Sequence, residues 1–168
     1  MPKIIENLES RLLEEARKQV DAYGYSALTV RSVAKACGVG IGTVYNYFTS
    51  KDEMLATYML ADWKSCIAAI HEAGECAVSP TPLIRCIHDQ LLLFADLHKS
   101  VFRDKSASVA FSGSLSHYHA MLRSQLSAPL KKFCQQDFTA DFIAEALLTW
   151  TMASKNFDDI YGVIEKLF

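Results

Sequence analysis

Apolar residues recur at every third or fourth position along most of the chain, which is the spacing of one face of an α-helix. The first such series consists of Ile5, Leu8, Leu12, Ala16, Val20 and Tyr23, and Gly24 follows it. No stretch alternates apolar and polar residues for long enough to predict a strand. We therefore expect an all-α fold.

Residues with capping and helix-breaking chemistry mark the boundaries between these helices. Thr29 is a suitable N-cap for a helix that Gly38 ends, and Ser50 with Glu53 forms the pattern of a capping box. Further helices are expected over 41–48, 50–71, 83–98, 100–112, 114–134, 138–153 and 157–168. Residues 74–82 hold a glycine and two prolines and are predicted to form a loop.

Three short pieces of the chain, 29–37, 38–40 and 41–48, form the pattern of a helix-turn-helix. The twelve residues from Cys37, CGVGIGTVYNYF, hold three glycines and three aromatic residues. Glycine permits backbone angles that larger residues resist, so two helices are able to meet there in a tight turn. A helix-turn-helix places its second helix in the major groove of DNA. The pattern therefore predicts a DNA-binding element.

The side chains of this segment suit contact with DNA. Gly42 has no side chain, so the start of the second helix is able to approach another surface closely. The hydroxyls of Thr43, Tyr45 and Tyr47 and the ammonium of Lys51 are groups that commonly contact phosphate. The sequence leaves open an alternative in which both tyrosines are half-buried packing residues.

Charge is unevenly distributed along the chain. The net charge is −2 and the isoelectric point is about 6.2, so the chain as a whole is not basic. Residues 1–51, however, carry seven basic and five acidic side chains, and no acidic residue occurs from Ala22 to Lys51. An acid-free segment does not repel phosphate, which is consistent with DNA binding there.

Other features of the composition bear on location. Five cysteines without paired spacing indicate reduced thiols inside a cell. The charged N-terminus has no apolar signal region. The longest apolar runs, such as LLLFA at 91–95, are far shorter than the roughly 20 residues that cross a bilayer. We expect a cytoplasmic protein with no membrane partner.

Residues 28–59, LTVRSVAKACGVGIGTVYNYFTSKDEMLATYM, resemble the DNA-binding segment of the TetR-type (TetR/AcrR) transcriptional regulators. The matching motifs are T-x-x-x-[IV]-A at 29–34, the A-G-V turn at 37–39, G-T-[LV]-Y-x-Y-F at 42–48 and S-K-[DE]-E at 50–53. The preceding helix is included, so the resemblance covers roughly the first 60 residues.

This resemblance implies an architecture and a function. Residues 1–50 are expected to form a three-helix DNA-binding domain, and residues 51–168 a helical ligand-binding and dimerisation domain. The implied function is a homodimeric transcriptional repressor that a small-molecule effector releases from a double-stranded DNA operator, without cofactor or enzymatic activity. The open alternative is a helical sensor of a small molecule or partner that does not read DNA. Gly40 and Ile41 permit it, because family members often have a hydroxyl residue at the position of Gly40.

The resemblance also implies which residues contact DNA. They are Thr29, Arg31, Ile41, Gly42, Thr43, Tyr45, Tyr47 and Lys51. Thr29 and Lys51 are expected at phosphates. Arg31 is expected at a phosphate or a guanine edge, and residues 41–43 at bases.

The rest of the chain carries many aromatic side chains together with several arginines, which favours an apolar ligand pocket with polar anchors. The candidate pocket residues are Trp63, Phe94, Phe102, Arg103, Phe111, Tyr118, Met121 and Trp150. The alternative is an ordinary core with exposed arginines.

Two apolar stripes near the C-terminus predict a dimer interface. Their members are Phe142, Ile143, Ala146, Leu147, Trp150, Ile160, Tyr161, Ile164 and Phe168. Two such helices from each of two chains would form a four-helix interface. The alternative is that both stripes are buried within one subunit.

Two histidine-containing pairs are candidates for metal or catalytic sites. Cys86 and His88, and His117 and His119, lie two residues apart, and residues at that spacing do not share a helix face. Ser114 lies close to the second pair, but no G-x-S-x-G motif or acidic partner accompanies it. We therefore expect no metal site and no enzymatic activity.

Overall fold

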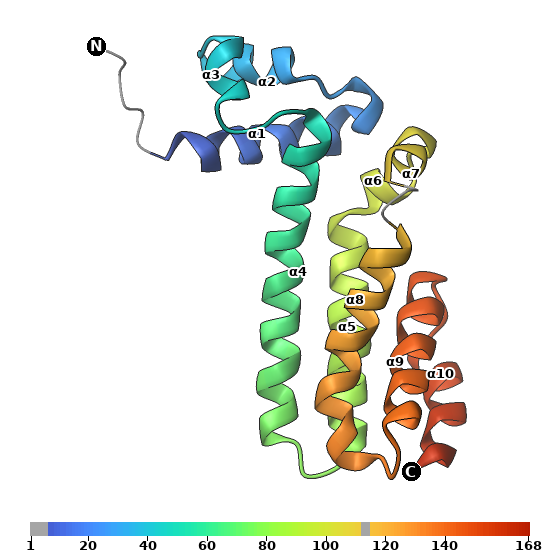
Figure 1. Cartoon of the computed structure of the whole chain (residues 1–168). Coiled ribbons are helices and arrows are strands. Elements are labelled where there is room, and N and C mark those ends of the chain that lie inside the picture. The colour runs from blue at the N-terminus through green and yellow to red at the C-terminus, as the bar shows by residue number, and fades with distance from the viewer. Residues whose placement is uncertain (1–6, 112–114) are drawn as a thin grey trace. The chain divides into compact units, whose positions relative to one another are not determined.

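The computed structural model describes residues 7–111 and 115–168, whose regular structure is entirely helical (Figure 1). The α-helices are α1 (Leu8–Tyr23), α2 (Val30–Cys37), α3 (Ile41–Tyr45), α4 (Lys51–Cys76), α5 (Pro80–Leu97), α6 (Lys99–Phe102), α7 (Lys105–Phe111), α8 (Leu115–Ser127), α9 (Asp137–Met152) and α10 (Phe157–Ile164). The 3₁₀ turns within the described ranges are η1 (Tyr25–Ala27), η3 (Ala128–Phe133) and η4 (Glu165–Leu167). The prediction of an all-α fold is confirmed.

The helices group into two compact units. Unit 1 holds α1, α2, α3, the part of α4 up to Ala61, α6 and α7. Unit 2 holds the rest of α4 from Asp62, together with α5, α8, α9 and α10. The units therefore do not follow a single cut of the chain after residue 50, and the functional domains 1–50 and 51–168 stay a prediction.

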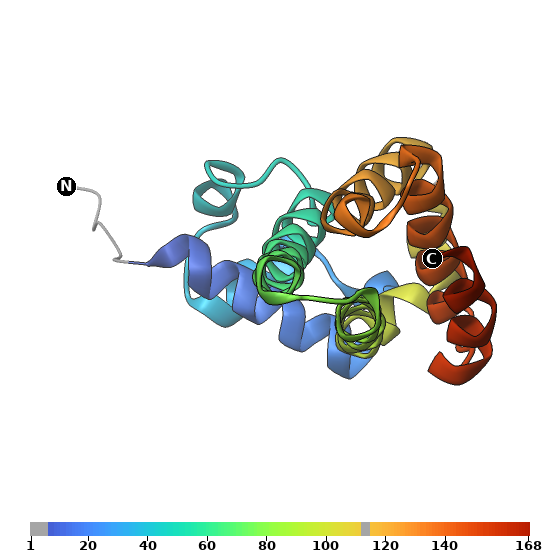
Figure 2. The same cartoon turned by 90° about the horizontal axis from the view of Figure 1, so that it is seen from below.

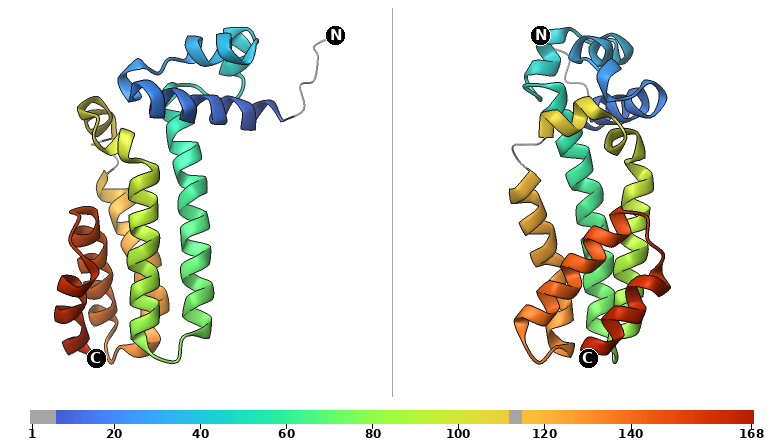
Figure 3. Two further views of the ribbon diagram at one scale, coloured as in Figure 1. Left: turned by 180° about the vertical axis from the view of Figure 1, so that it is seen from behind. Right: turned by 90° about the vertical axis from the view of Figure 1, so that its right-hand side faces the viewer.

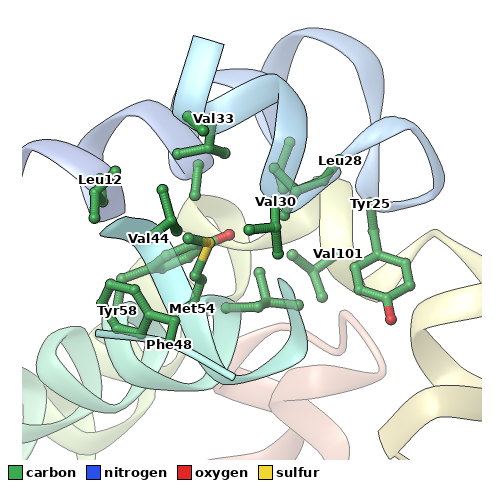
Figure 4. Packing of buried hydrophobic residues seen from close by; sticks show 14 of the residues in the cluster. Leu12, Tyr25, Leu28, Val30, Val33, Val44, Phe48, Met54, Tyr58 and Val101 are labelled. Carbon is green, nitrogen blue, oxygen red and sulfur yellow. The ribbon is translucent and has the colours of Figure 1, made fainter. Parts of the chain in front are cut away.

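Unit 1 has one hydrophobic core, to which each of its helices contributes (Figure 4). The buried members are Leu8, Leu12, Ala16, Val20, Tyr25, Leu28, Val30, Val33, Ala34, Val44, Phe48, Met54, Leu55, Tyr58, Val101 and Ala107. The four buried residues of α1 belong to the series that the three-and-four spacing predicts, but the inclusion of Tyr23 was wrong, because its side chain is 75% exposed at the end of the helix. Ile5, the first member of that series, lies outside the described residues. Val101 and Ala107 come from α6 and α7, so a segment distant in sequence completes the core of the N-terminal helices.

The tight turn between α2 and α3 follows from its glycine. Gly38 ends α2 with a φ of 69°, in the left-handed region that glycine adopts most easily. The N–H of Val39 donates to the carbonyl oxygen of Ala34 at 3.0 Å and so satisfies a carbonyl in the last turn of α2. At the other end, Oγ1 of Thr29 accepts the N–H of Ser32 at 3.0 Å. The predicted cap and the predicted stop of α2 are both confirmed.

Other boundaries differ from the predicted ones. Helix α3 ends at Tyr45, earlier than predicted, and α4 continues past His71 to Cys76. The loop predicted over 74–82 is present but shorter, because α4 ends at Cys76 and α5 begins at Pro80, which leaves residues 77–79 as the connection. Proline suits the first turn of a helix, where its missing N–H removes no helical hydrogen bond.

Gly74 lies inside α4 because of packing within unit 2. A Cβ atom at Gly74 would lie 2.8 Å from Cβ of Pro129, so only glycine fits without a shift of one of the two segments. The ammonium of Lys132, in the same turn as Pro129, donates to the carbonyl oxygens of Gly74 and Ala77. These bonds satisfy carbonyls at the C-terminal end of α4. Gly74 therefore serves close packing and not a loop.

Overpacking at Gly74→Ala should cost about 1–3 kcal/mol of the free energy of unfolding. Because alanine favours a helix over glycine by roughly 1 kcal/mol, the net loss of stability should be at most about 2 kcal/mol. Gly162→Ala in α10 is the matched control, because a Cβ atom there meets nothing within 4 Å. The control should be as stable as the native chain or more so in chemical denaturation. A stabilised Gly74→Ala variant would contradict the packing role.

In unit 2, α9 packs against α5, α8 and α10 (Figures 2 and 3). Helix α10 also packs against α5, where Oη of Tyr161 and Oγ1 of Thr81 lie 2.6 Å apart. The ring of Phe157 stacks on that of Tyr161, and the guanidinium carbon of Arg85 lies 3.8 Å from the centre of the Phe157 ring. These contacts fix the last helix to the first helix that lies wholly in this unit.

Candidate nucleic-acid interface

Helix α3 and the turn after it pack one side against the core of unit 1 and leave the opposite side exposed. Val44 is fully buried and Phe48 is 3% exposed. By contrast, Ile41, Tyr45 and Tyr47 are 39%, 52% and 43% exposed. Large side chains at this exposure contribute little to the core and present a contact surface.

The start of α3 is open. A Cβ atom at Gly42 would meet nothing within 4 Å. The N-cap residue, Gly40, has no side chain that could cap the helix, and its carbonyl oxygen accepts the N–H of Thr43 at 2.9 Å. Thr43 is partly buried. The backbone at the start of α3 is therefore able to come close to a flat or grooved partner.

The first turn of α2 adds polar groups. Thr29 is exposed and its hydroxyl oxygen caps the helix, which leaves the hydroxyl proton as a donor. Arg31 is exposed, and in the part of the chain that the structure describes its guanidinium has no ion pair. The segment from α2 through α3 contains no carboxylate side chain. This chemistry suits a polyanion.

Lys51 has a structural contact that the sequence analysis missed. Its Nζ donates to the carbonyl oxygen of Tyr25 at 3.1 Å and lies 4.0 Å from the centre of that ring. The Tyr25 hydroxyl donates to Oδ1 of Asp52 at 2.5 Å, and burial together with this carboxylate raises the pKa of Tyr25. A cation in the first turn of a helix, where the dipole disfavours it, was the available signal. The ammonium has further protons, so its phosphate contact stays a prediction.

Asp104 connects the start of α7 to η1, the turn that contains Tyr25. Its carboxylate accepts the backbone N–H of Ser26 at 3.1 Å and that of Ser106 at 2.8 Å. Burial acts to raise the pKa of Asp104, but these hydrogen bonds prevail and hold it below its usual value. The residues just before α2 are therefore held by a segment that enters unit 1 from α5.

We expect the protein to lose stability as the pH falls below about 4. A carboxylate with a depressed pKa in the folded state stabilises the fold above its unfolded pKa, and this contribution is lost as the pH falls through the folded pKa. Asp104 is one such group, and Glu53 is another because hydrogen bonds from Thr49 lower its pKa. Asp104→Asn should melt below the native chain at pH 7, and the difference should shrink at pH 3. An undiminished difference at pH 3 would refute the role of the charge.

The predicted pocket residues fall in different places. Trp63 and Phe94 meet edge to face in unit 2 with ring centres 5.4 Å apart. The indole N–H of Trp63 donates to Oε1 of Gln125 at 2.7 Å, a polar contact that the sequence analysis missed. Phe102 and Arg103 belong to unit 1, and both are exposed. The structure thus brings together only part of the predicted set.

The remaining pocket candidates are also dispersed. On α8, Tyr118 is exposed and Met121 is partly buried. The side chain of Phe111 lies outside the described residues. Trp150 is half exposed and lines a groove against α10. A pocket formed by the full predicted set stays a prediction.

That groove lies between α9 and α10 and has a volume of about 500 Å³. Its lining residues are Phe142, Ala146, Trp150, Lys155, Asp159, Ile160, Val163 and Ile164. Phe142, Trp150 and Val163 are 48%, 50% and 62% exposed. The groove is therefore apolar along most of its length, with one ammonium and one carboxylate among its lining groups.

The residues predicted for a dimer interface divide into two sets. The buried set is Ile143, Leu147, Ile160 and Ile164, and the partly or largely exposed set is Phe142, Ala146, Trp150 and Phe168. Tyr161 is engaged within unit 2 through Thr81 and Phe157. Each of the two interpretations of these stripes thus applies to some of their residues, and the interface stays a prediction.

Among the described residues, no three His, Cys, Asp or Glu side chains come together in a way that could hold a metal ion. Burial raises the pKa of the thiols of Cys37, Cys66, Cys86 and Cys134, so these thiols are protonated at neutral pH.

No helix in the described ranges combines the length and apolar character needed to cross a membrane.

Comparison with known proteins addresses the N-terminal region first. Residues 12–58 match the family model described as bacterial regulatory proteins, tetR family. The uncharacterised HTH-type transcriptional regulator YhgD of Bacillus subtilis is 30% identical over 92 residues, which cover 53% of this chain and 45% of YhgD. UidR of Escherichia coli, also an HTH-type transcriptional regulator, is 27% identical over 66 residues, or 39% of this chain and 34% of UidR. The match thus spans less than half the length of either relative.

Solved structures resemble nearly the whole chain. GusR of Salmonella enterica superposes with a TM-score of 0.70 at 17% identity, covering 98% of this chain and 96% of GusR. The TetR family repressor AlkX of Dietzia sp. superposes with a TM-score of 0.63 at 16% identity, covering 93% of each chain. At these identities the likeness establishes the fold.

Proposed function

We propose that this chain, a member of the TetR family of bacterial regulatory proteins, is a homodimeric repressor. We further propose that a small molecule releases it from its operator. The family is one of non-enzymatic, helix-turn-helix transcriptional regulators. The observation that carries the proposal is the acid-free surface of α2, α3 and the turn that follows α3. On this surface Tyr45 and Tyr47 are about half exposed, although their neighbours Val44 and Phe48 are buried. Action on an operator places the protein in the cytoplasm.

The groove between α9 and α10 supports the dimer. Its exposed aromatic residues, Phe142 and Trp150, are the kind of side chain that anchors protein interfaces. A two-fold dimer presents two helix-turn-helix elements, which suits an operator with two half-sites about 34 Å apart. Two half-sites also give an affinity that one short recognition helix does not reach alone.

Continuity of the chain supports a response to a ligand. Helix α4 begins in unit 1 and ends in unit 2, and α5 of unit 2 leads directly into α6 of unit 1. Val101 and Ala107 then enter the core of unit 1, and Asp104 holds the turn before α2. A small molecule bound among apolar residues of unit 2, near Trp63, would act on the DNA-binding helices through these two connections.

The test is fluorescence anisotropy of the purified protein with DNA from upstream of its own coding region, against a scrambled duplex, at several salt concentrations. Tight binding to the first duplex alone, falling steeply with salt, would support the proposal. Arg31→Ala should weaken binding and reduce the salt slope by about one. Lys64→Ala removes the same charge from unit 2 and serves as the control. If binding to both duplexes is weak and equal, the same measurement is made with fragments from the whole genome. Weak and equal binding to all of those fragments would mean that the protein is a helical sensor that does not read DNA.

A further inference from the structure

The exposed side of α3 is formed by four residues. Ile41, Gly42, Tyr45 and Asn46 are all exposed. Offsets of one, four and five residues place them on one side of a helix, whereas Val44, on the other side, is fully buried. Ile41, Gly42 and Tyr45 are among the predicted DNA contacts, whereas Asn46, which follows Tyr45 as the C-cap of α3, is not.

The chemistry of this face is uncharged. None of its four residues has a guanidinium, an ammonium or a carboxylate, although guanine is most often read by Arg or Lys and cytosine by Asp or Glu. The face offers the aliphatic side chain of Ile41 and the amide of Asn46. In the described part of the chain this amide forms no hydrogen bond. An aliphatic group suits the C5-methyl of thymine, and an asparagine amide suits the N6 and N7 edge of adenine.

We propose that each operator half-site presents A·T base pairs to this face, with a thymine methyl against Ile41 and an adenine edge against Asn46. This inference rests on the proposed function, because it names the DNA sequence class that the same surface reads. Gly42 makes the contact possible: without a Cβ atom, the helix backbone comes close enough for the aliphatic side chain next to it to reach the floor of the groove. Arg31, on α2, lies outside this face and is left to a phosphate or a flanking base.

The test begins with selection of bound duplexes from a random pool by the full chain, which defines the half-site. Each thymine of the half-site is then replaced by deoxyuridine, which removes only the C5-methyl. One such replacement should lower the DNA affinity of the native chain about fourfold, the effect of one buried methyl group, and should not change the DNA affinity of the Ile41→Ala variant. Replacing one adenine by 7-deazaadenine, which lacks the N7 acceptor, should lower the DNA affinity of the native chain about tenfold. It should not change the DNA affinity of the Asn46→Ala variant. Val78→Ala, at a residue that is 96% exposed in unit 2, should respond to both replacements as the native chain does.

The outcomes separate the inference from the function. Two results would overturn the reading of A·T pairs but leave sequence-specific binding intact. One is selection of a half-site whose central pairs are G·C, and the other is an equal loss of DNA affinity in the native chain and the variants when the bases are replaced. Failure to select any duplex would overturn both the proposed function and this inference. Methyl sensitivity that disappears only in Ile41→Ala, with N7 sensitivity that disappears only in Asn46→Ala, would establish it.

Discussion

Phe48→Ala is expected to lower the free energy of unfolding by about 3–5 kcal/mol, the usual cost of removing a buried aromatic ring. Phe48 is 3% exposed and belongs to the core of unit 1 together with Val44, Met54 and Tyr58. Removal of its ring leaves a cavity where α3 meets the start of α4. A typical domain is stable by only about 5–15 kcal/mol, so this loss is large.

Tyr47→Ala is the matched control for this change. The two residues are adjacent in sequence, yet Tyr47 is 43% exposed, so its replacement should cost about 1 kcal/mol or less. Denaturant unfolding followed by circular dichroism measures both variants. Tyr47→Ala should also weaken DNA binding at a temperature at which it is fully folded. If the two variants were equally destabilised, the assignment of Phe48 to the buried side and Tyr47 to the exposed side of the turn after α3 would be wrong.

Trp150→Ala is expected to weaken the homodimer by about 30- to 1000-fold, which corresponds to a loss of about 2–4 kcal/mol at an interface hot spot. Trp150 is half exposed and lines the groove between α9 and α10. Because half of its surface is already exposed, the variant should fold normally. Analytical ultracentrifugation across a concentration series measures the dimer dissociation constant. Operator affinity should fall with it, since a monomer binds one half-site.

The control is Phe138→Ala, an aromatic residue on the same helix that is 74% exposed and does not line the groove. It should leave the dimer dissociation constant within about threefold of the native value, the effect of a peripheral residue. A Trp150→Ala chain that still dimerises as tightly as this control would place the interface elsewhere. A native chain that is monomeric at all concentrations would remove the dimer from the proposed function.

Much of unit 1 could be predicted from the sequence because the signals there are local. The cap at Thr29 and the stop at Gly38 depend on hydrogen bonds and a φ angle within a few residues of each position. Val44 and Phe48 are four residues apart, the spacing at which residues share one side of a helix, and both are buried. Helix boundaries in the C-terminal part were predicted less well, because the position of Gly74 inside α4 depends on Pro129, which is distant in sequence.

Capping and amphipathic spacing act over one or two turns, so local patterns suffice to predict that the chain is helical, where the helix-turn-helix lies and which side of α3 is buried. Two further features became known from the packing of the helices: α6 and α7 complete the core of unit 1 through Val101 and Ala107, and Lys51 and Asp104 both hold the turn before α2. Such contacts join residues that are far apart in sequence. No local pattern specifies them, since they depend on which surfaces meet when the helices pack.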